Sequence, residues 1–380
     1  MSNHHGVTRG KGCAHAGLGH FGRLFPKLPH LYTHTSLLEE LGRPGGLMDG
    51  DSTPDSDIPA GYTFFAQFVD HDITLDTGSQ LESDQVQHVE KIPNLRTASL
   101  DLDCVYGFGP EASPHLYDNA EEGKLLTGTD DNPEDLARAS DGTALIGDPR
   151  NDENIFVAQM QNVFIKLHNR FIDEGLHFEE AQETCRFHYQ YVVLHDFLKR
   201  VCDPDIYKFA VDRIYRKQYP LCYGPDEHGK LPMPVEFSVA AYRFGHSMVR
   251  SRYRVRSTSG SRARKRNVDL FDETLSTGGF TVLPPEISVD WSCLLPVDST
   301  TPDMGKAIDG KLASELNDLP FMRNGEPNPV KRSLAFRNLL RGRSLGLPSG
   351  QDVAAALADC GYDIEPETIN LPNARFPGFR

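Results

Sequence analysis

The feature that most constrains the fold is a pair of consecutive helical patterns between residues 147 and 201. Apolar residues recur at helical spacing from Asn151 to Glu174. Asp148 is a suitable N-cap, the proline after it suits the first helical position, and Gly175 is a suitable C-cap. A second helix is predicted from Phe178 to Val201, and its Tyr, Val, Leu and Phe content indicates that it is largely buried. Because strand-like alternation is scarce, the fold is predicted to be mainly α-helical.

Weaker patterns complete the expected organisation. Residues 235–249 are predicted to form a third helix, residues 250–269 a basic turn region, and residues 305–340 further helical pieces. Residues 1–60 are rich in Gly, Pro and His and are expected to form an extended N-terminal arm, followed by one domain over residues 61–380.

The composition narrows the class of protein. Hydrophobic residues make up 38% of the 380, and no apolar stretch reaches the 18 residues of a membrane span. A net charge of -15 argues against nucleic-acid binding. Seven cysteines without a C-x-x-C pair suit free thiols in a reducing compartment. Since the first residues show no signal peptide, we expect a cytoplasmic protein, with leaderless export as the alternative.

The run from Gln67 to Asp72 places one titratable base between two carboxylates. In a helix, Gln67 and His71 lie one above the other, Asp70 flanks them, and Asp72 points roughly to the opposite side. One helix end would then direct a base and a carboxylate toward one site and a second carboxylate toward another. A solvated acidic helix end is the alternative that these residues alone leave open.

Two further histidines lie in predicted helices. His168 sits between apolar positions and is interpreted as a structural core residue. His246 follows Arg243 by three residues, so both project from the same side of their helix. No H-E-x-x-H spacing is present that would indicate histidines sharing one metal ion.

Four segments together resemble the animal-type haem peroxidases, the peroxidase–cyclooxygenase superfamily: Gln67–Asp72, Gly147–Arg170, Ala241–Val249 and Asn338–Pro348. The resemblance extends over about residues 60–350, in the family's order. It implies a helical haem peroxidase domain that holds haem b between distal and proximal helices. It also implies reduction of hydrogen peroxide through a ferryl intermediate and oxidation of small donors.

The resemblance assigns the residues on the distal side of the haem. Cleavage of hydrogen peroxide requires a base that moves a proton and a fixed cation that stabilises the developing oxyanion. His71 matches the base and Arg150 the cation. Gln67 matches the residue that binds a distal water or a halide, and burial beside Arg150 is expected to keep His71 neutral.

The proximal side is assigned in the same way. His246 matches the iron ligand, and Asn338 matches the asparagine that orients this histidine. Arg243 and Arg341 are candidates for pairing with the haem propionates.

Asp70 and Glu153 match the residues that form ester bonds to haem methyl groups in this family. One helix is expected to present both Arg150 and Glu153 to the same haem edge. Asn154 stands where myeloperoxidase carries the methionine of its sulfonium link. The absence of this methionine predicts little chloride oxidation and the use of iodide, bromide, thiocyanate or phenols.

The second carboxylate, Asp72, is expected to bind calcium. The segment from Thr97 to Asp103 offers oxygen atoms at every second residue, which suits this hard cation, and the family has a calcium loop here. The predicted ligands are Asp72, Thr97, the backbone carbonyl of Ser99, Asp101 and Asp103. An exposed acidic strand is the alternative.

Two other functions are alternatives to peroxidase. A fatty-acid dioxygenase of this superfamily needs a tyrosine three residues before the proximal histidine; Arg243 stands there, and Tyr242 is expected to point away. A haem- or calcium-binding adhesion module resembling peroxinectin is disfavoured because no RGD or KGD tripeptide occurs.

The chain ends about 30 residues after Pro348, which leaves a minimal form or a fragment open. The oligomeric state is not indicated.

Overall fold

The structure is a computed structural model, and it describes residues 19–50, 54–83, 85–225, 229, 231–257, 264–273, 275–297 and 299–364. Its α-helices are α1 (Thr35–Gly42), α2 (Gly61–Ile73), α3 (Asp103–Tyr106), α4 (Ile155–Asp173), α5 (Phe178–Val192), α6 (Leu198–Val201), α7 (Pro204–Tyr215), α8 (Pro329–Arg332), α9 (Leu334–Ser344) and α10 (Gly350–Asp359). Its strands are β1 (Gly19–Gly22), β2 (Asp55–Pro59), β3 (Pro93–Asn94), β4 (Met233–Pro234), β5 (Arg252–Ser257), β6 (Arg264–Asp269), β7 (Ile287–Ser288) and β8 (Met304–Lys306).

Short 3-10 and π turns connect these elements. The 3-10 turns are η1 (Val89–Lys91), η2 (Pro114–Leu116), η3 (Pro149–Asp152), η6 (Ala241–His246), η7 (Trp291–Cys293), η8 (Ser314–Asn317) and η9 (Pro320–Met322). Two π turns are η4 (Val193–Phe197) and η5 (Glu236–Ala240).

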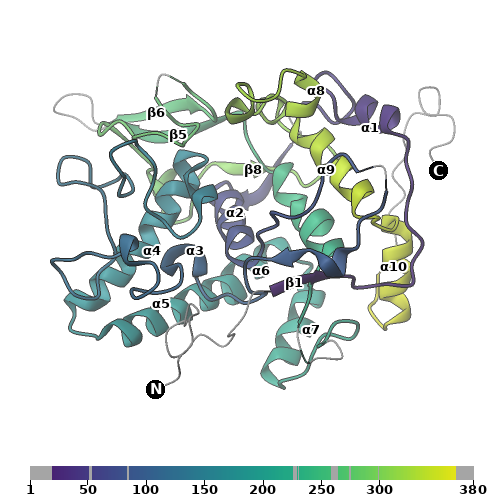
Figure 1. Ribbon diagram of the computed structural model, residues 1–380, viewed down its shortest axis with the longest axis horizontal. Coiled ribbons are helices and arrows are strands. Elements are labelled where there is room, and N and C mark those ends of the chain that lie inside the picture. Colours follow the sequence, from purple (N-terminus) through teal and green to yellow (C-terminus); the bar gives the residue numbers. More distant parts are fainter. Residues whose placement is uncertain are drawn as a thin grey trace.

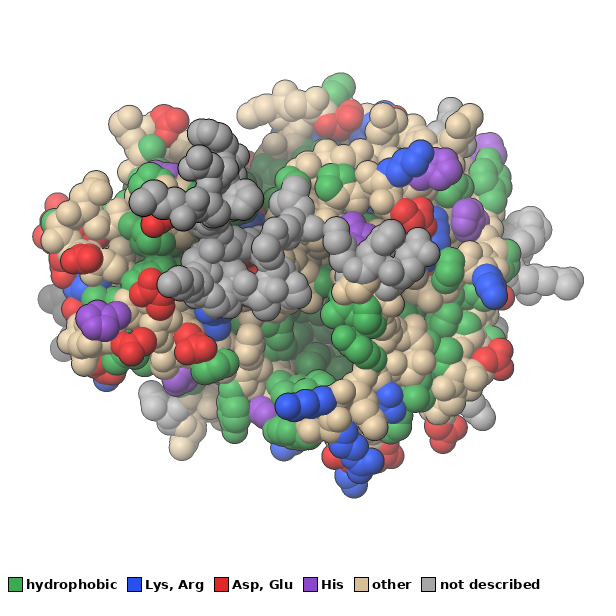
Figure 2. Space-filling view, turned by 60° about the horizontal axis from the view of Figure 1, so that its bottom comes forward, with side chains coloured by type: hydrophobic (Ala, Val, Ile, Leu, Met, Phe, Trp, Pro, Cys, Tyr) green, Lys and Arg blue, Asp and Glu red, His purple; other side chains and the backbone are tan. Residues whose placement is uncertain are grey.

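Helices surround α2, and three small sheets lie around them (Figure 1). The strand orders are β3-β1-β4, β2-β8 and β6-β5-β7. The prediction of a mainly α-helical fold is confirmed. Hydrophobic side chains surround a hollow on the face seen in Figure 2, and acidic side chains are frequent toward the end that carries α4 and α5.

Helix α2 is the centre of the core. Apart from Gln67, all of its residues are buried, and it contacts α3, α4, β2, β8, η3 and η6. Phe68 is fully buried and stacks on Phe164 of α4 at 4.9 Å between ring centroids. Replacing such a side chain with alanine costs about 3–5 kcal/mol, so α2 is fixed mainly by packing.

The second predicted long helix is correct in extent but not in burial. It is continuous through α5, η4 and α6, from Phe178 to Val201. Only one face is buried, for example at Cys185 and Tyr189, whereas Phe187 is 59% and Tyr191 66% exposed. The prediction of a largely buried helix is therefore wrong, because the apolar residues occur on both faces.

The predicted basic turn region is instead an antiparallel hairpin of β5 and β6. Tyr253 and Val255 point into the core, while Arg252 pairs with Asp269 and Arg254 with Asp303, both at 2.7–2.8 Å. Arg252 and Arg254 therefore balance the negative charges of acidic side chains on the outer face of the hairpin.

The single helix predicted from residue 151 is also divided. Asp148 caps the 3-10 turn η3, and Asn154 caps α4 by accepting hydrogen bonds from the backbone of Phe156 and Val157. The two cap residues Asp148 and Asn154 thus start two successive helical segments, and Glu153 lies at the junction between these segments. Gly175 follows the end of α4 at a φ of 96°, as expected for a C-terminal glycine.

The third predicted helix is not an α-helix. Residues 236–246 form the π turn η5 followed by the 3-10 turn η6. The predicted N-terminal arm is extended only in part, since its described residues include α1, which contacts α9, and strands β1 and β2. Whether residues 61–380 form a separate domain stays a prediction.

Candidate active site

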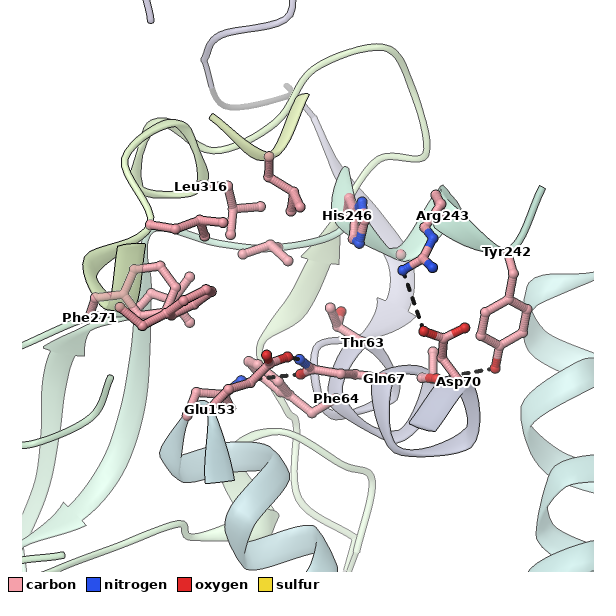
Figure 3. Close-up of a pocket in the computed structure, with 18 residues that line it drawn as sticks. Thr63, Phe64, Gln67, Asp70, Glu153, Tyr242, Arg243, His246, Phe271 and Leu316 are labelled. Carbon is pink, nitrogen blue, oxygen red and sulfur yellow. Dashed lines mark hydrogen bonds and ion pairs between the residues drawn. The ribbon is translucent and has the colours of Figure 1, made fainter. Parts of the chain in front are cut away.

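One cavity is lined by five of the residues predicted to face the haem: Gln67, Asp70, Glu153, Arg243 and His246 (Figure 3). Thr63, Ala66, Gln67 and Asp70 line it from α2. Tyr242, Arg243, Gly245 and His246 line the opposite side from η6, and Glu153 and Asn154 close one end. The remaining wall is apolar and includes Leu270, Phe271, Leu316 and Leu319. A flat apolar group with polar atoms near its edges would meet suitable partners here.

His71 is buried behind this cavity and is held by a chain of amides. Its Nδ1–H donates to Asn151 Oδ1 at 2.7 Å, and Asn151 Nδ2 donates to Gln161 Oε1 at 2.8 Å. Burial first, and the positive charge of Arg150 second, lower the pKa of His71 to about 4. At neutral pH the imidazole is therefore neutral, and its Nε2 carries the lone pair that a base requires.

Glu153 lies between His71 and the cavity. His71 Nε2 is 3.7 Å from Glu153 Oε1, and the same oxygen accepts a hydrogen bond from Gln67 Nε2. Asn154 Nδ2 in turn donates to Gln67 Oε1 at 3.2 Å. Burial raises the pKa of Glu153 to about 7, so its carboxyl group gains or loses a proton near neutral pH. His71 itself does not line the cavity, and it meets the cavity through Glu153.

Arg150 is not directed into the cavity. Its Nε donates to Asp148 Oδ1 at 3.0 Å, and its Nη2 donates to Asp148 Oδ2 at 2.7 Å and to the carbonyl of His71 at 3.1 Å. Arg150 thereby supports the C-terminal end of α2, where helical carbonyls lack partners. Although burial opposes it, contact with Arg150 and Arg96 holds the pKa of Asp148 well below its usual range.

Asp70 and Arg243 form an ion pair across the cavity. Arg243 Nη1 lies 3.4 Å from Asp70 Oδ2, and Arg243 Nε donates to the carbonyl of Ser238 at 3.0 Å. Burial of Asp70 would raise its pKa, but the positive charge of Arg243 lowers it, so the carboxylate stays ionised. The structure thus brings together Asp70, the carboxylate predicted to face haem, and Arg243, the cation predicted to pair with the haem propionates.

On the other side of the cavity, Asn338 of α9 fixes His246. The side-chain nitrogen Nδ2 of Asn338 lies 2.8 Å from His246 Nδ1 and, in this orientation, donates to it. A 180° turn of the amide exchanges its oxygen and nitrogen, so that the oxygen would accept the Nδ1 proton and leave the Nε2 lone pair for the cavity. Burial and the nearby charge of Arg243 lower the pKa of His246 to about 3, so this ring is also neutral. The ring is partly accessible because a second cavity, lined by Leu38, Leu339 and Pro348 among others, lies behind it.

Arg341 lies outside the main cavity. Its Nη1 donates to Asp76 Oδ2 and Ser79 Oγ, both at 2.6 Å. It lines a small hollow together with Asp76 and Arg243. His168, predicted to be structural, is fully buried and bonds Tyr106 and the carbonyl of Gly123.

Some of the predicted calcium ligands lie close together. Asp72 is fully buried, and neither of its carboxylate oxygens has a hydrogen-bond partner of normal geometry. Burial, together with the charges of Asp101 and Asp103, raises its pKa well above the usual range. Thr97 Oγ1 donates to Asp101 Oδ2 at 2.7 Å. Within the described ranges, however, no group of three or more His, Cys, Asp or Glu side chains has an arrangement that could hold a metal ion.

Tyr242 corrects one prediction. It was expected to point away, but it lines the cavity, and its hydroxyl donates to the carbonyl of Ala66 at 3.2 Å. The reason is the backbone, because η6 is a 3-10 turn and not the α-helix from which the direction was predicted.

Sequence reasoning also missed the supporting residues Asp148, Asn151 and Asn154. Asp148 was recognised only as a cap, and Asn154 only as a departure from a related enzyme. The dense run of polar residues between two helical segments was the available signal, since side chains at helix starts bond nearby backbone and side-chain groups.

Comparisons with known proteins show the family and the fold of the chain. Residues 81–358 match the family model described as "Animal haem peroxidase". A "Peroxidase-like protein" from Margaritifera margaritifera is 29% identical over 181 residues, which cover 42% of this chain and 22% of that protein's length.

Solved structures share the fold. Peroxidase A from Dictyostelium discoideum superposes with a TM-score of 0.58 at 16% identity, covering 90% of this chain and 75% of that one. A fatty acid alpha-dioxygenase from Oryza sativa has a TM-score of 0.55 at 19% identity, covering 85% of this chain and 61% of that one. The enzyme of that name from Arabidopsis thaliana has a TM-score of 0.57 at 17% identity, covering 90% and 62%. In the part of the chain that the structure describes, no helix has the length and apolarity to span a membrane.

Proposed function

The chain belongs to the animal haem peroxidase family, and we propose that it reduces hydrogen peroxide and oxidises small donors at the cavity between α2 and η6. The residues present fit haem. A neutral imidazole, His246, meets the cavity with its other nitrogen fixed by Asn338, and the walls are largely apolar. Bound haem would supply the redox-active iron at which the peroxide oxygen–oxygen bond is broken.

The observation that carries the proposal is the state of His71. Its Nδ1–H is engaged by Asn151, and its pKa of about 4 leaves Nε2 unprotonated at neutral pH. It can therefore accept a proton from peroxide at Nε2 and return it to the departing oxygen. Glu153, 3.7 Å from Nε2, must move or relay that proton, because it separates His71 from the cavity.

Arg150 acts in this proposal by positioning. It ties η3 to the end of α2 through Asp148 and the His71 carbonyl, and its charge helps keep His71 neutral. The predicted direct contact with a developing oxyanion would require the guanidinium to leave Asp148. We retain iodide, bromide, thiocyanate and phenols as the donors, because Asn154, which lies at the cavity beside Gln67, cannot form the sulfonium link of a methionine.

Ester bonds between haem methyl groups and Asp70 or Glu153 are part of the proposal. Both carboxyl groups line the cavity, and they come from different places in the chain, α2 and the junction between η3 and α4. Arg243, which pairs with Asp70, is free to bind a propionate once Asp70 is esterified, because esterification removes the carboxylate charge.

The test is an absorbance spectrum of the protein after haem addition and peroxide treatment, before and after extraction with acidic organic solvent. A Soret band that survives extraction is expected, and Asp70→Val with Glu153→Gln should remove this retention. The absence of any Soret band would contradict the proposal as a whole.

Calcium binding by Asp72 is proposed from its two unpartnered oxygens, with Thr97, Ser99, Asp101 and Asp103 as further ligands. Burying an uncompensated charge is costly, and a cation would offset it. Calcium should raise the unfolding temperature of the wild type, and Asp72→Asn should abolish this rise while stabilising the calcium-free protein. Equal calcium effects in both proteins would exclude this site.

A fatty-acid dioxygenase is the second candidate, because Tyr242 lines the cavity and two structural relatives carry that name. It predicts oxygen uptake with a long-chain fatty acid that is lost in Tyr242→Phe. We favour peroxidase because the Tyr242 hydroxyl is bonded to the α2 backbone. Peroxide-dependent oxidation of a phenol that persists in Tyr242→Phe would support this preference.

A further inference from the structure

Two peripheral helices, α7 and α10, meet away from the active site. Neither contributes a buried residue to the core. The contacts between them involve Phe209 of α7, Leu221 after α7 and Tyr362 after α10. Leu221 N donates to Tyr362 Oη at 3.3 Å, and the rings of Phe209 and Tyr362 pack edge to face at 5.7 Å.

Two cysteines lie within this contact. Leu221 and Gly361, the sequence neighbours of Cys222 and Cys360, face each other, since a Cβ on Gly361 would lie 3.6 Å from Leu221 Cδ1. The backbones on both sides therefore bring the two cysteine positions close together. In agreement with this, the Cys360 thiol is among the groups that raise the pKa of Cys222, and both cysteines are partly exposed.

The other described cysteines have different surroundings. Cys104, Cys185 and Cys293 are buried, and Cys185 donates weakly to the carbonyl of Phe164. Cys202 is half-buried beside Asp203. Contact with a second thiol combined with access to solvent distinguishes Cys222 and Cys360 from these four.

We propose that Cys222 and Cys360 are a site of oxidation to a disulfide that fastens α10 to the segment after α7. The oxidant is a hydroperoxide, the class of molecule that the proposed function brings to this protein. One thiolate attacks the peroxide oxygen and becomes a sulfenic acid as the oxygen–oxygen bond breaks and water leaves. The second sulfur then attacks the first, and the S–OH oxygen leaves as water. Two thiols and one hydrogen peroxide give one disulfide and two waters.

The surroundings make this a slow, structural modification. Burial and the bond to Cys360 raise the pKa of the Cys222 thiol to about 11, which leaves little thiolate at neutral pH. The cross-link joins residues far apart in the sequence, and such links stabilise chiefly by restricting the unfolded chain.

The test uses the full chain without haem, so its outcome is independent of peroxidase activity. The reduced protein is incubated with hydrogen peroxide, its thiols are counted under denaturing conditions, and peptides are mapped without reduction. We expect the loss of two thiols and a peptide pair joining Cys222 to Cys360. The unfolding temperature should rise by about 3–6 °C and return after dithiothreitol.

Matched variants locate the effect. Cys202→Ser removes a half-buried thiol outside the pair and should behave like the wild type. Cys222→Ser and Cys360→Ser should each lose the cross-linked peptides and the rise in unfolding temperature. A disulfide with another cysteine, or no disulfide, would overturn the proposal, and a disulfide without a temperature rise would overturn its stabilising role.

Discussion

The two histidines of the active site are held in different ways. His71 lies on an α-helix that is almost entirely buried, and its ring is fixed by Asn151, which is itself fixed by Gln161. His246 lies on a 3-10 turn after a π turn, has Asn338 as its ring partner, and stands between two cavities. The buried network would give His71, the proposed base, one orientation and one protonation state. The cavity-lined turn would leave one nitrogen of His246, the proposed metal ligand, accessible.

The largest expected effect falls on the cavity-lined histidine. His246→Ala should prevent stable haem binding, because it removes the proposed iron ligand. Titration with haem, followed by the Soret absorbance, measures this. A variant that still binds haem with wild-type affinity and spectrum would show that His246 is not the ligand.

His71→Ala should separate the two histidines. Haem binding should persist, while the rate constant of peroxide cleavage falls by about 10²–10⁴-fold, the usual contribution of a positioned acid–base group. Stopped-flow absorbance after mixing with peroxide gives this rate constant. If it is unchanged, Glu153 or another group is the base.

A smaller effect is expected at the support of His71. Asn151→Ala removes the acceptor of the Nδ1 proton and should slow peroxide cleavage by about 10–100-fold with little change in haem affinity. Asn162→Ala is the matched control, since this buried amide donates to backbone carbonyls of the loop at 133–135. Equal losses in both variants would indicate general destabilisation.

The pH dependence should be the mildest effect over the ordinary range. Because the pKa of folded His71 is about 4, protonation of His71 should slow peroxide cleavage only near pH 4, and a change near pH 7 is expected from Glu153, whose pKa is about 7. His71 takes up a proton at higher pH when unfolded than when folded, so its contribution lowers stability as the pH falls from 6.5 toward 4. A decline in rate centred at pH 6.5 that persists in Glu153→Gln would show that His71 is exposed when peroxide binds.

The sequence was sufficient for features set by local patterns. Helix α4 follows from helical spacing ended by Gly175, and the helical arrangement considered for Gln67 to Asp72 is the one found in α2. The hairpin was missed although Arg252 to Arg256 alternate with Tyr253 and Val255 at a period of two, because the arginines were read as a charge cluster.

Other features depend on distant partners and could not be predicted locally. The π and 3-10 geometry of residues 236–246 places Tyr242 in the cavity, and Glu236 accepts hydrogen bonds from the backbone of Leu24 and Phe25. The direction of Arg150 depends on Asp148 and on the end of α2, which lies far away in the sequence. Motifs therefore identified several residues that line one cavity, but not the directions of Arg150 and Tyr242.

The placement of Asn338 on α9 also affects the order in which the protein matures. Synthesis proceeds at about 5–20 residues per second, so roughly 15–50 s separate the appearance of His71 from that of Asn338. During this interval the nascent chain contains α2 but lacks Asn338, the ring partner of His246. The proposed haem site would therefore be complete only after nearly the whole described chain has been synthesised.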